Sequence, residues 1–112
     1  MLSPGPATKI YLATGATDMR KSFNGLYALV SGTLDADPLS GHLFVFCNRR
    51  RDRIKILCFD GSGLWVCAKR LEKGTFAWPQ PCEGPVELAQ AELNLLVGGL
   101  DLSRTRKRRW LR

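Results

Sequence analysis

The spacing of apolar residues predicts a strand and then a long amphipathic helix near the start of the chain. Residues 8–13, TKIYLA, are rich in strand-forming side chains, and the turn sequence TGAT follows them. Beyond it, apolar residues recur at i, i+4, i+7, i+8 and i+11: Met19, Phe23, Leu26, Tyr27 and Val30. This period predicts a helix over residues 17–33, with Thr17 as its N-cap.

Three apolar runs in the middle of the chain predict an antiparallel meander. HLFVFCN (42–48) is apolar on both faces, which is typical of a central strand. RIKILCFD (53–60) and GLWVCAKRL (63–71) follow it, joined by DGSG, whose glycines accept the positive φ of a tight hairpin turn. EKGTFAW (72–78) predicts a fourth, shorter strand at the edge of the sheet.

A second helix is predicted after the proline-rich linker PQPCEGP (79–85). Pro85 suits the first turn of a helix, and Gly98-Gly99 would end it. The apolar stripe between them consists of Val86, Ala89, Leu93, Leu96 and Val97. The predicted fold is α+β: a mostly antiparallel sheet of four to five strands, in β-α-β-β-β-(β)-α order, with two helices packed on it. We expect one domain over residues 1–103 and a flexible tail over 104–112.

Composition and charge narrow the class of protein. The chain has 112 residues with 45% apolar content, and no apolar run has the roughly 18 residues that a membrane span needs. The first residues, MLSPGPATK, lack the pattern of a secretion signal, so we expect a cytoplasmic protein. The net charge is +7, and six of the 17 basic residues lie in the last nine positions. The rest of the chain is nearly balanced in charge.

Two basic clusters are candidate contacts for DNA. Arg49, Arg50, Arg51 and Arg53 fall at the turn between two predicted strands, where a basic hairpin can approach a nucleic-acid backbone. A solvated turn is the equally weighted alternative. The tail carries the second cluster, which consists of Arg104, Arg106, Lys107, Arg108 and Arg109 beside Trp110. Such a block is typical of a nucleic-acid-binding arm, and a solubilising tail or a binder of acidic protein are its alternatives.

The sequence offers little for catalysis, a cofactor or a metal. The cysteines Cys47, Cys58 and Cys67 lie in apolar runs and are expected to pack as free thiols. His42 begins a predicted strand with no nucleophile beside it, and we expect it at the surface or at an edge of the sheet. The carboxylates Asp18, Asp60, Glu72, Glu83 and Glu92 are not expected to converge. The aromatic residues Phe23, Phe44, Phe46, Phe59 and Trp65 are expected in the core.

Several motifs together resemble a known family. These are TDMRK (17–21), SGHLFVF (40–46), NRRRDRIKIL (48–57) and RLEKG-x-F-x-W (70–78). They are similar to the insertion-sequence-66 Orf2-like family, the small accessory proteins called TnpB, over residues 8–100. These proteins share only a name with the RNA-guided nucleases called TnpB. The resemblance implies an element that also encodes a separate, larger transposase, and it carries over no catalytic residues.

The combined expectation is a non-catalytic accessory protein of transposition. We expect it to bind DNA, with the ends of the element as the hypothesised target, and to act with the transposase. The alternative is an adaptor that contacts the transposase and touches DNA little or not at all. A small nuclease is a third, weaker interpretation.

Overall fold

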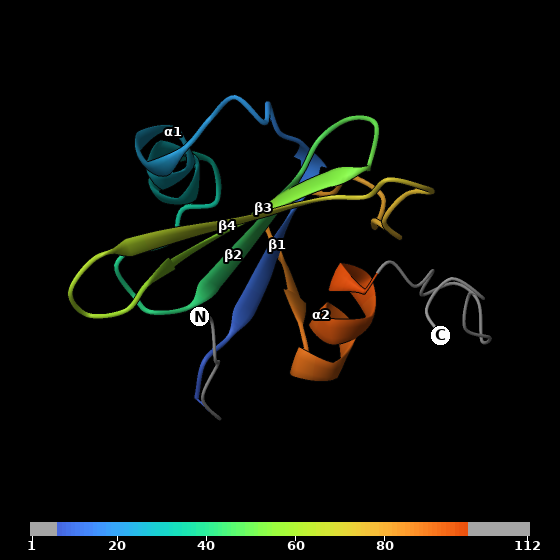
Figure 1. Cartoon of the computed structure of the whole chain (residues 1–112). Helices are drawn as coiled ribbons and strands as arrows, with labels where there is room; N and C mark the ends of the chain where they lie inside the picture. The colour runs from blue at the N-terminus through green and yellow to red at the C-terminus, as the bar shows by residue number, and fades with distance from the viewer. Residues whose placement is uncertain (1–6, 99–112) are drawn as a thin grey trace.

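A five-stranded sheet with helical segments on both faces forms the protein (Figure 1). The computed structural model describes residues 7–98. The strands are β1 (Ile10–Ala16), β2 (Leu43–Cys47), β3 (Arg53–Phe59), β4 (Leu64–Arg70) and β5 (Val86–Leu88). The helices are α1 (Phe23–Ala28), which continues into the π-helical turn η1 (Leu29–Thr33), and α2 (Gln90–Val97).

The sheet is mixed, with the order β4-β3-β2-β1-β5. β1 and β2 are parallel, whereas the pairs β2–β3, β3–β4 and β1–β5 are antiparallel. The α+β class is therefore confirmed, but the sheet is mixed where a mostly antiparallel one was expected. The reason is the crossover through α1 and η1, since a chain that passes over one face can return to the sheet in the same direction.

The first helix begins at Phe23, six residues later than predicted. The Thr17 backbone N–H donates to the Cys47 carbonyl oxygen at 2.8 Å, so Thr17, the residue after β1, is still bonded to the end of β2. The prediction of Thr17 as an N-cap is therefore wrong. A turn follows it, in which the Lys21 N–H donates to the Asp18 carbonyl oxygen at 3.1 Å. The pairing of Thr17 with β2 prevents the helix from starting where the apolar period begins.

The fifth strand lies elsewhere than predicted. Residues 72–78 form no strand, and residues 86–88, predicted as the start of a helix, pair antiparallel with β1 as β5. Phe76 and Trp78 are buried at 2% and 9% exposure, so this segment packs on the core instead of extending the sheet. The unpaired edge of β1 takes up β5, and the second helix then begins at Gln90.

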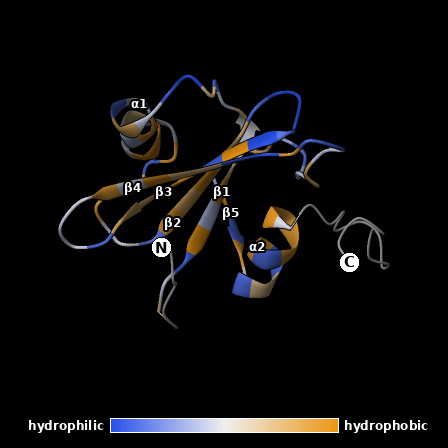
Figure 2. Ribbon diagram, in the orientation of Figure 1, coloured by the Kyte–Doolittle hydropathy of each residue, from blue (hydrophilic) through white to orange (hydrophobic). Residues whose placement is uncertain are grey.

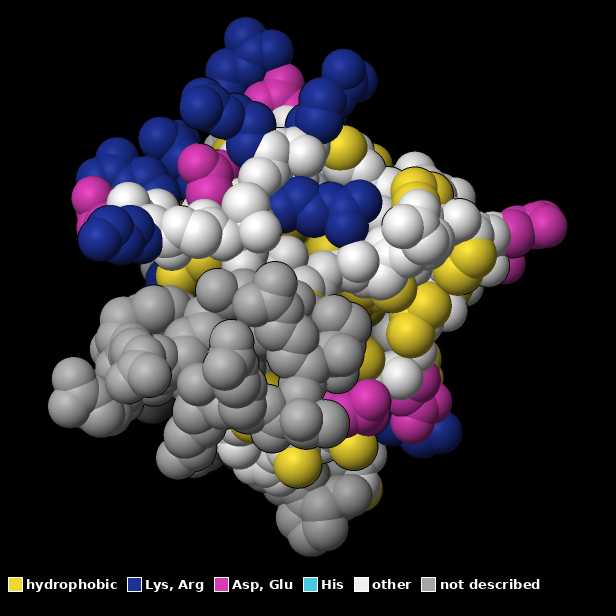
Figure 3. Space-filling view, turned by 90° about the vertical axis from the view of Figure 1, so that its right-hand side faces the viewer, with side chains coloured by type: hydrophobic (Ala, Val, Ile, Leu, Met, Phe, Trp, Pro, Cys, Tyr) yellow, Lys and Arg dark blue, Asp and Glu magenta, His cyan; other side chains and the backbone are white. Residues whose placement is uncertain are grey.

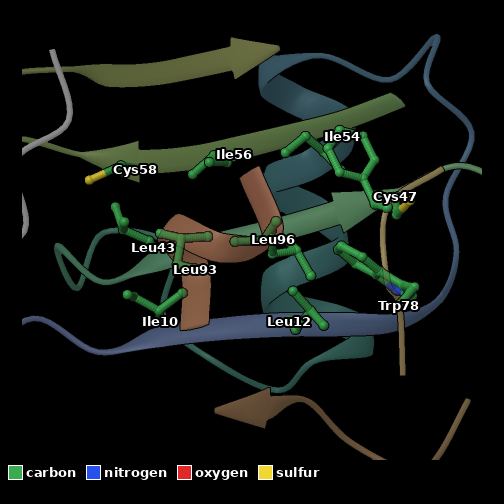
Figure 4. Close-up of a cluster of buried hydrophobic side chains, with 12 residues drawn as sticks. Ile10, Leu12, Leu43, Cys47, Ile54, Ile56, Cys58, Trp78, Leu93 and Leu96 are labelled. Atoms are coloured by element: carbon green, nitrogen blue, oxygen red, sulfur yellow. The ribbon is translucent and has the colours of Figure 1, made fainter. Parts of the chain in front are cut away.

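The core has two halves because both faces of the sheet are covered. β2 is buried at every position, as expected for a central strand. Side chains of β1, β2 and β3 alternate between a cluster under α2 (Figure 4) and a cluster under α1, and the apolar colouring of these strands follows this placement (Figure 2). Phe44 and Phe46 are buried as expected, but Phe23 and Trp65 are 47% and 45% exposed and lie outside the core.

Cys47 and Cys58 are buried as expected, whereas Cys67 and His42 are only half-buried. All four cysteines are free, and Cys82 is exposed. Burial raises the pKa of the Cys47 thiol to about 11. The His42 Nδ1 accepts a hydrogen bond from the Lys9 N–H at 3.0 Å. In residues 7–98, no helix has the length and apolar content to cross a membrane.

Candidate nucleic-acid interface

A groove of about 600 Å³ lies at the carboxyl ends of the parallel strands β1 and β2. One wall is the end of β1 and the segment after it, residues 16–20. The other is the turn after β2 and the start of β3, with residues 48–50, 52 and 53 as its lining. These segments are far apart in the sequence, and the pairing of Ala16 with Cys47 brings them together. The walls contain most of the motifs TDMRK and NRRRDR, all but Lys21 and Arg51, so the parallel pairing brings two sequence motifs to one groove.

Asn48 shapes the turn between β2 and β3. Its side-chain Oδ1 accepts hydrogen bonds from the backbone N–H groups of Asp52 and Arg53, both at 3.1 Å. Its Nδ2 donates to the Asp52 carboxylate at 2.8 Å, and the Asn48 carbonyl oxygen accepts from the Arg51 N–H at 3.2 Å. The hydrogen bond from Asn48 is the main cause that lowers the pKa of Asp52. These hydrogen bonds fix the backbone conformation of the turn.

Arg51 points away from the groove. Its backbone adopts a positive φ of 63°, and its guanidinium Nη1 donates to the Trp78 carbonyl oxygen at 2.9 Å. Its own carbonyl oxygen accepts from the Phe76 N–H at 2.7 Å. Arg51 therefore ties the segment around Phe76 and Trp78 to the turn. It does not line the groove, unlike its neighbours Arg49 and Arg50.

Arg49, Arg50 and Arg53 are exposed and line the groove. In residues 7–98, ion pairs join Arg20 to Asp18 and Arg70 to Glu72, and neither pair involves these three arginines. Like charges that are close together repel, and in this turn only Asp52 opposes them. The turn consequently holds a local excess of positive charge.

Asp18 and Arg20 form an ion pair with each other on the wall of the groove opposite the β2–β3 turn. The Arg20 guanidinium donates to Oδ2 of Asp18 from Nη2 at 2.7 Å and to Oδ1 from Nε at 3.1 Å, and the Arg20 backbone N–H donates to Oδ1 at 2.9 Å. These bonds from Arg20 lower the pKa of Asp18 to about 2. The Arg20 side chain remains 91% exposed, so its charge still faces solvent.

A second groove of about 460 Å³ continues from the first along β3 and β4. The two share Met19 and Arg53 as lining residues. Arg53 lies directly opposite Arg70 in the β3–β4 register, an arrangement of like charges that destabilises a sheet. Arg70 is offset by Glu72 at 3.1 Å, whereas Arg53 forms no ion pair in the described chain.

We call the cations that line the two grooves the basic track. They are Arg20, Arg49, Arg50, Arg53, Lys55, Lys69 and Arg70. The acidic residues lining the same grooves are Asp18, Asp52 and Glu72, so seven basic residues line the grooves against three acidic ones. The ammonium groups of Lys55 and Lys69 donate to backbone carbonyl oxygens, of Lys21 and Val97 respectively, both at 2.7 Å. Figure 3 views this end of the sheet and shows Lys and Arg side chains gathered in its upper part, with a few acidic side chains among them.

The structure shows which arginines of the predicted cluster line the groove and which do not. Arg49, Arg50 and Arg53 lie in the groove, and Arg51 is turned toward Trp78. The predicted tail contacts, Arg104, Arg106, Lys107, Arg108 and Arg109, lie outside the described residues. Arg20, Lys55, Lys69 and Arg70 were not predicted as site residues. The motif TDMRK was a signal for Arg20, but no local pattern placed Lys55, Lys69 or Arg70 beside it.

The fold and site define a small α+β protein with a basic track at one end of its sheet. The model of the family described as IS66 Orf2-like protein matches residues 8–107. The chain therefore belongs to the IS66 Orf2-like family, which confirms the resemblance seen in its motifs. Membership supports an accessory role in an insertion sequence.

Two similar proteins come from Sinorhizobium fredii (strain NBRC 101917 / NGR234), and both are named as uncharacterized. The protein y4jC is 40% identical over 108 residues, which cover 96% of this chain and 92% of that protein. The protein y4hO is 39% identical over 101 residues, which cover 90% of this chain and 88% of that protein. No solved structure matches the chain.

Proposed function

We propose that this protein is a non-catalytic accessory protein of insertion-sequence transposition that binds DNA along the basic track and acts with the separate transposase. The observation that carries the proposal is the convergence of two family motifs on one groove lined by Arg49, Arg50 and Arg53. None of these guanidinium groups has an ion-pair partner in residues 7–98. Phosphate groups, like carboxylates, accept two parallel hydrogen bonds from a guanidinium group.

Binding of this kind acts mainly on the DNA backbone. Contacts to phosphates position a protein on the duplex but carry no sequence information directly, so we expect a weak sequence preference. Each neutralised phosphate releases condensed counterions. With about six contacts, the slope of log affinity against log salt concentration is expected to be about −5.

The acidic groups near the track support a binding role rather than a chemical one. The Asp18 carboxylate is engaged by Arg20, and the Asp52 carboxylate is engaged by Asn48. In residues 7–98, no group of three or more His, Cys, Asp and Glu side chains is arranged to hold a metal ion. The proposal therefore uses the carboxylates to shape the two walls of the groove.

The test is fluorescence anisotropy of the full chain on a labelled duplex from the element's end and on a scrambled duplex, titrated with salt. Arg49→Ala/Arg50→Ala is expected to weaken binding about thirtyfold, since the net contribution of a solvent-exposed contact is about 1 kcal/mol, and to reduce the salt slope by about 2. The control is Lys9→Ala/Lys73→Ala, which removes the same charge from exposed positions outside both grooves.

Two results would contradict the proposal. One is wild-type binding that does not respond to salt, and the other is an equal loss of affinity in the control variant. The second result would show that net charge, rather than the basic track, governs binding.

A second candidate function is an adaptor that pairs with the transposase. The observation that favours it is β4, an edge strand whose outer side has no backbone partner in the described chain. Such edges accept a strand from another protein. Copurification with the transposase that survives nuclease treatment and high salt, together with absent duplex binding, would favour the adaptor.

A further inference from the structure

We infer that the hydroxyl group of Thr17 is a hydrogen-bond donor for one phosphate of the bound nucleic acid. Thr17 is only 8% exposed, and it lines the basic groove. It also lines a smaller pocket of about 280 Å³ between the end of β1, η1 and the segment around Cys82. Thr17 thus lies at the boundary between these two cavities. The inference rests on the proposed function and adds a specific contact to it.

The hydroxyl of Thr17 has no hydrogen-bond partner in residues 7–98, although its backbone N–H donates to Cys47. The neighbouring Thr14, 4% exposed, is the natural comparison. Its hydroxyl donates to the Cys82 carbonyl oxygen at 3.3 Å and accepts from the Cys82 N–H at 3.0 Å. The great majority of buried polar groups are hydrogen-bonded, and an unsatisfied one destabilises the fold. Thr14 has a structural partner, whereas Thr17 lacks one.

The basic residues that line the groove around Thr17 indicate which kind of ligand binds there. Arg49 and Arg50 line the same groove from the turn after β2, and Arg20 lines it three residues further along the chain from Thr17. An anion is therefore the group that this site attracts. Threonine hydroxyls are ordinary donors to phosphate oxygens, and a short buried side chain holds its contact in one place. Thr17 would position a backbone phosphate that the arginines neutralise.

Because the Thr17 hydroxyl is uncharged, its removal should change duplex affinity without changing the salt dependence of binding. Thr17→Val replaces the hydroxyl with a methyl group of similar size, and duplex affinity is expected to fall roughly 3- to 10-fold. The salt slope is expected to stay unchanged, since no counterion-releasing charge is lost. The urea midpoint of unfolding is expected to stay the same or rise, because the variant removes an unsatisfied buried group. Thr17→Ser should restore the affinity.

Thr14→Val is the matched control. It is expected to lower the urea midpoint, because it leaves the Cys82 N–H without its acceptor, while duplex affinity and salt slope stay near the wild-type values. Wild-type affinity in Thr17→Val would overturn the inference. So would a lower urea midpoint in Thr17→Val with unchanged binding, because the hydroxyl would then have a structural role.

Inorganic phosphate separates this inference from the proposed function. Thermal unfolding of the wild type and of Thr17→Val is followed while phosphate is added, with chloride at equal ionic strength as the reference. If the wild type binds no duplex but phosphate raises its Tm more than that of Thr17→Val, the DNA proposal fails and the phosphate contact stands. If phosphate protects both equally and the duplex binds both equally, the inference fails and the DNA proposal stands.

Discussion

The two hairpin turns of the sheet hold their backbones by the same device and leave different surfaces. In the β3–β4 turn, the Asp60 Oδ1 accepts from the N–H groups of Ser62 and Gly63, both at 2.9 Å. In the β2–β3 turn, the Asn48 Oδ1 accepts from two N–H groups in the same way. One turn uses a charged side chain for this purpose, and the other uses a neutral one.

The difference shows which turn is available to a partner. The Asp60 Oδ2 also accepts from the Trp65 indole N–H at 2.7 Å, and these hydrogen bonds hold the pKa of Asp60 well below its usual range. Its charge is satisfied within its own hairpin. In the β2–β3 turn the neutral amide of Asn48 accepts the backbone hydrogen bonds. The charges of Arg49 and Arg50 have no ion-pair partner in the described chain. Four predictions can break or sharpen this comparison.

The largest expected effect is that of Asn48→Ala on stability. The change removes three hydrogen bonds that the Asn48 amide makes to Asp52 and Arg53. Because these bonds fix the backbone of the turn, we expect the free energy of unfolding to fall by about 2–4 kcal/mol. Urea denaturation measures it. Asn24→Ala, at an exposed position of α1, is the control. A loss below about 0.5 kcal/mol, the size of an ordinary surface substitution, would show that the turn holds its shape without the amide.

Arg51→Ala against Arg49→Ala separates the inward arginine from an outward one. Arg51→Ala leaves the Trp78 carbonyl oxygen without its donor, and we expect the free energy of unfolding to fall by about 1–3 kcal/mol. Arg49→Ala should change it by no more than about 0.5 kcal/mol but reduce the salt slope of DNA binding by about 1. Urea denaturation of both variants measures the free energy of unfolding, and fluorescence anisotropy measures the salt slope of DNA binding. Equal behaviour of the two variants would remove the distinction.

Asp18→Asn is expected to strengthen DNA binding. Asparagine keeps an oxygen for the Arg20 N–H, but the charge that holds the Arg20 guanidinium is lost. We expect duplex affinity to rise roughly 2- to 5-fold and the salt slope to steepen by about 1. Asp37→Asn is the matched control, since Asp37 accepts from the Leu39 N–H in a similar turn outside both grooves. An unchanged slope would place Arg20 outside the DNA contact.

The smallest expected effect is on stability in acid. Asp18 and Asp60 have lowered pKa values in the folded protein, so their contributions to stability are present above the ordinary aspartate value of 3.8. For Asp18 the contribution is lost as the pH falls toward about 2. Both carboxylates are exposed, which keeps the effect small. Thermal unfolding from about pH 5 to pH 2 should show that Asp60→Asn is less stable than the wild type above about pH 4, with a gap that narrows in acid. A gap independent of pH would contradict this.

The elements that could be predicted from the sequence are those set by local patterns. β2, β3 and β4 follow from apolar runs and from the turn sequence DGSG, and their observed bounds lie within the predicted ranges. The boundaries failed where pairing with a distant strand overrode local preference. Thr17 resembles an N-cap in sequence but bonds to Cys47, and Val86 follows a helix-type proline but pairs with β1.

The candidate site was predicted only in part, for the same reason. The sequence by itself determined the arginine cluster, the family motifs and the excess of positive charge, because these depend only on which residues are present and near each other in the chain. The tertiary structure decided that β1 and β2 run parallel, that TDMRK and NRRRDR share one groove, and that Arg51 turns inward while Arg49 and Arg50 do not. Those outcomes depend on hydrogen bonds between residues that are distant in sequence, which no local period or spacing records.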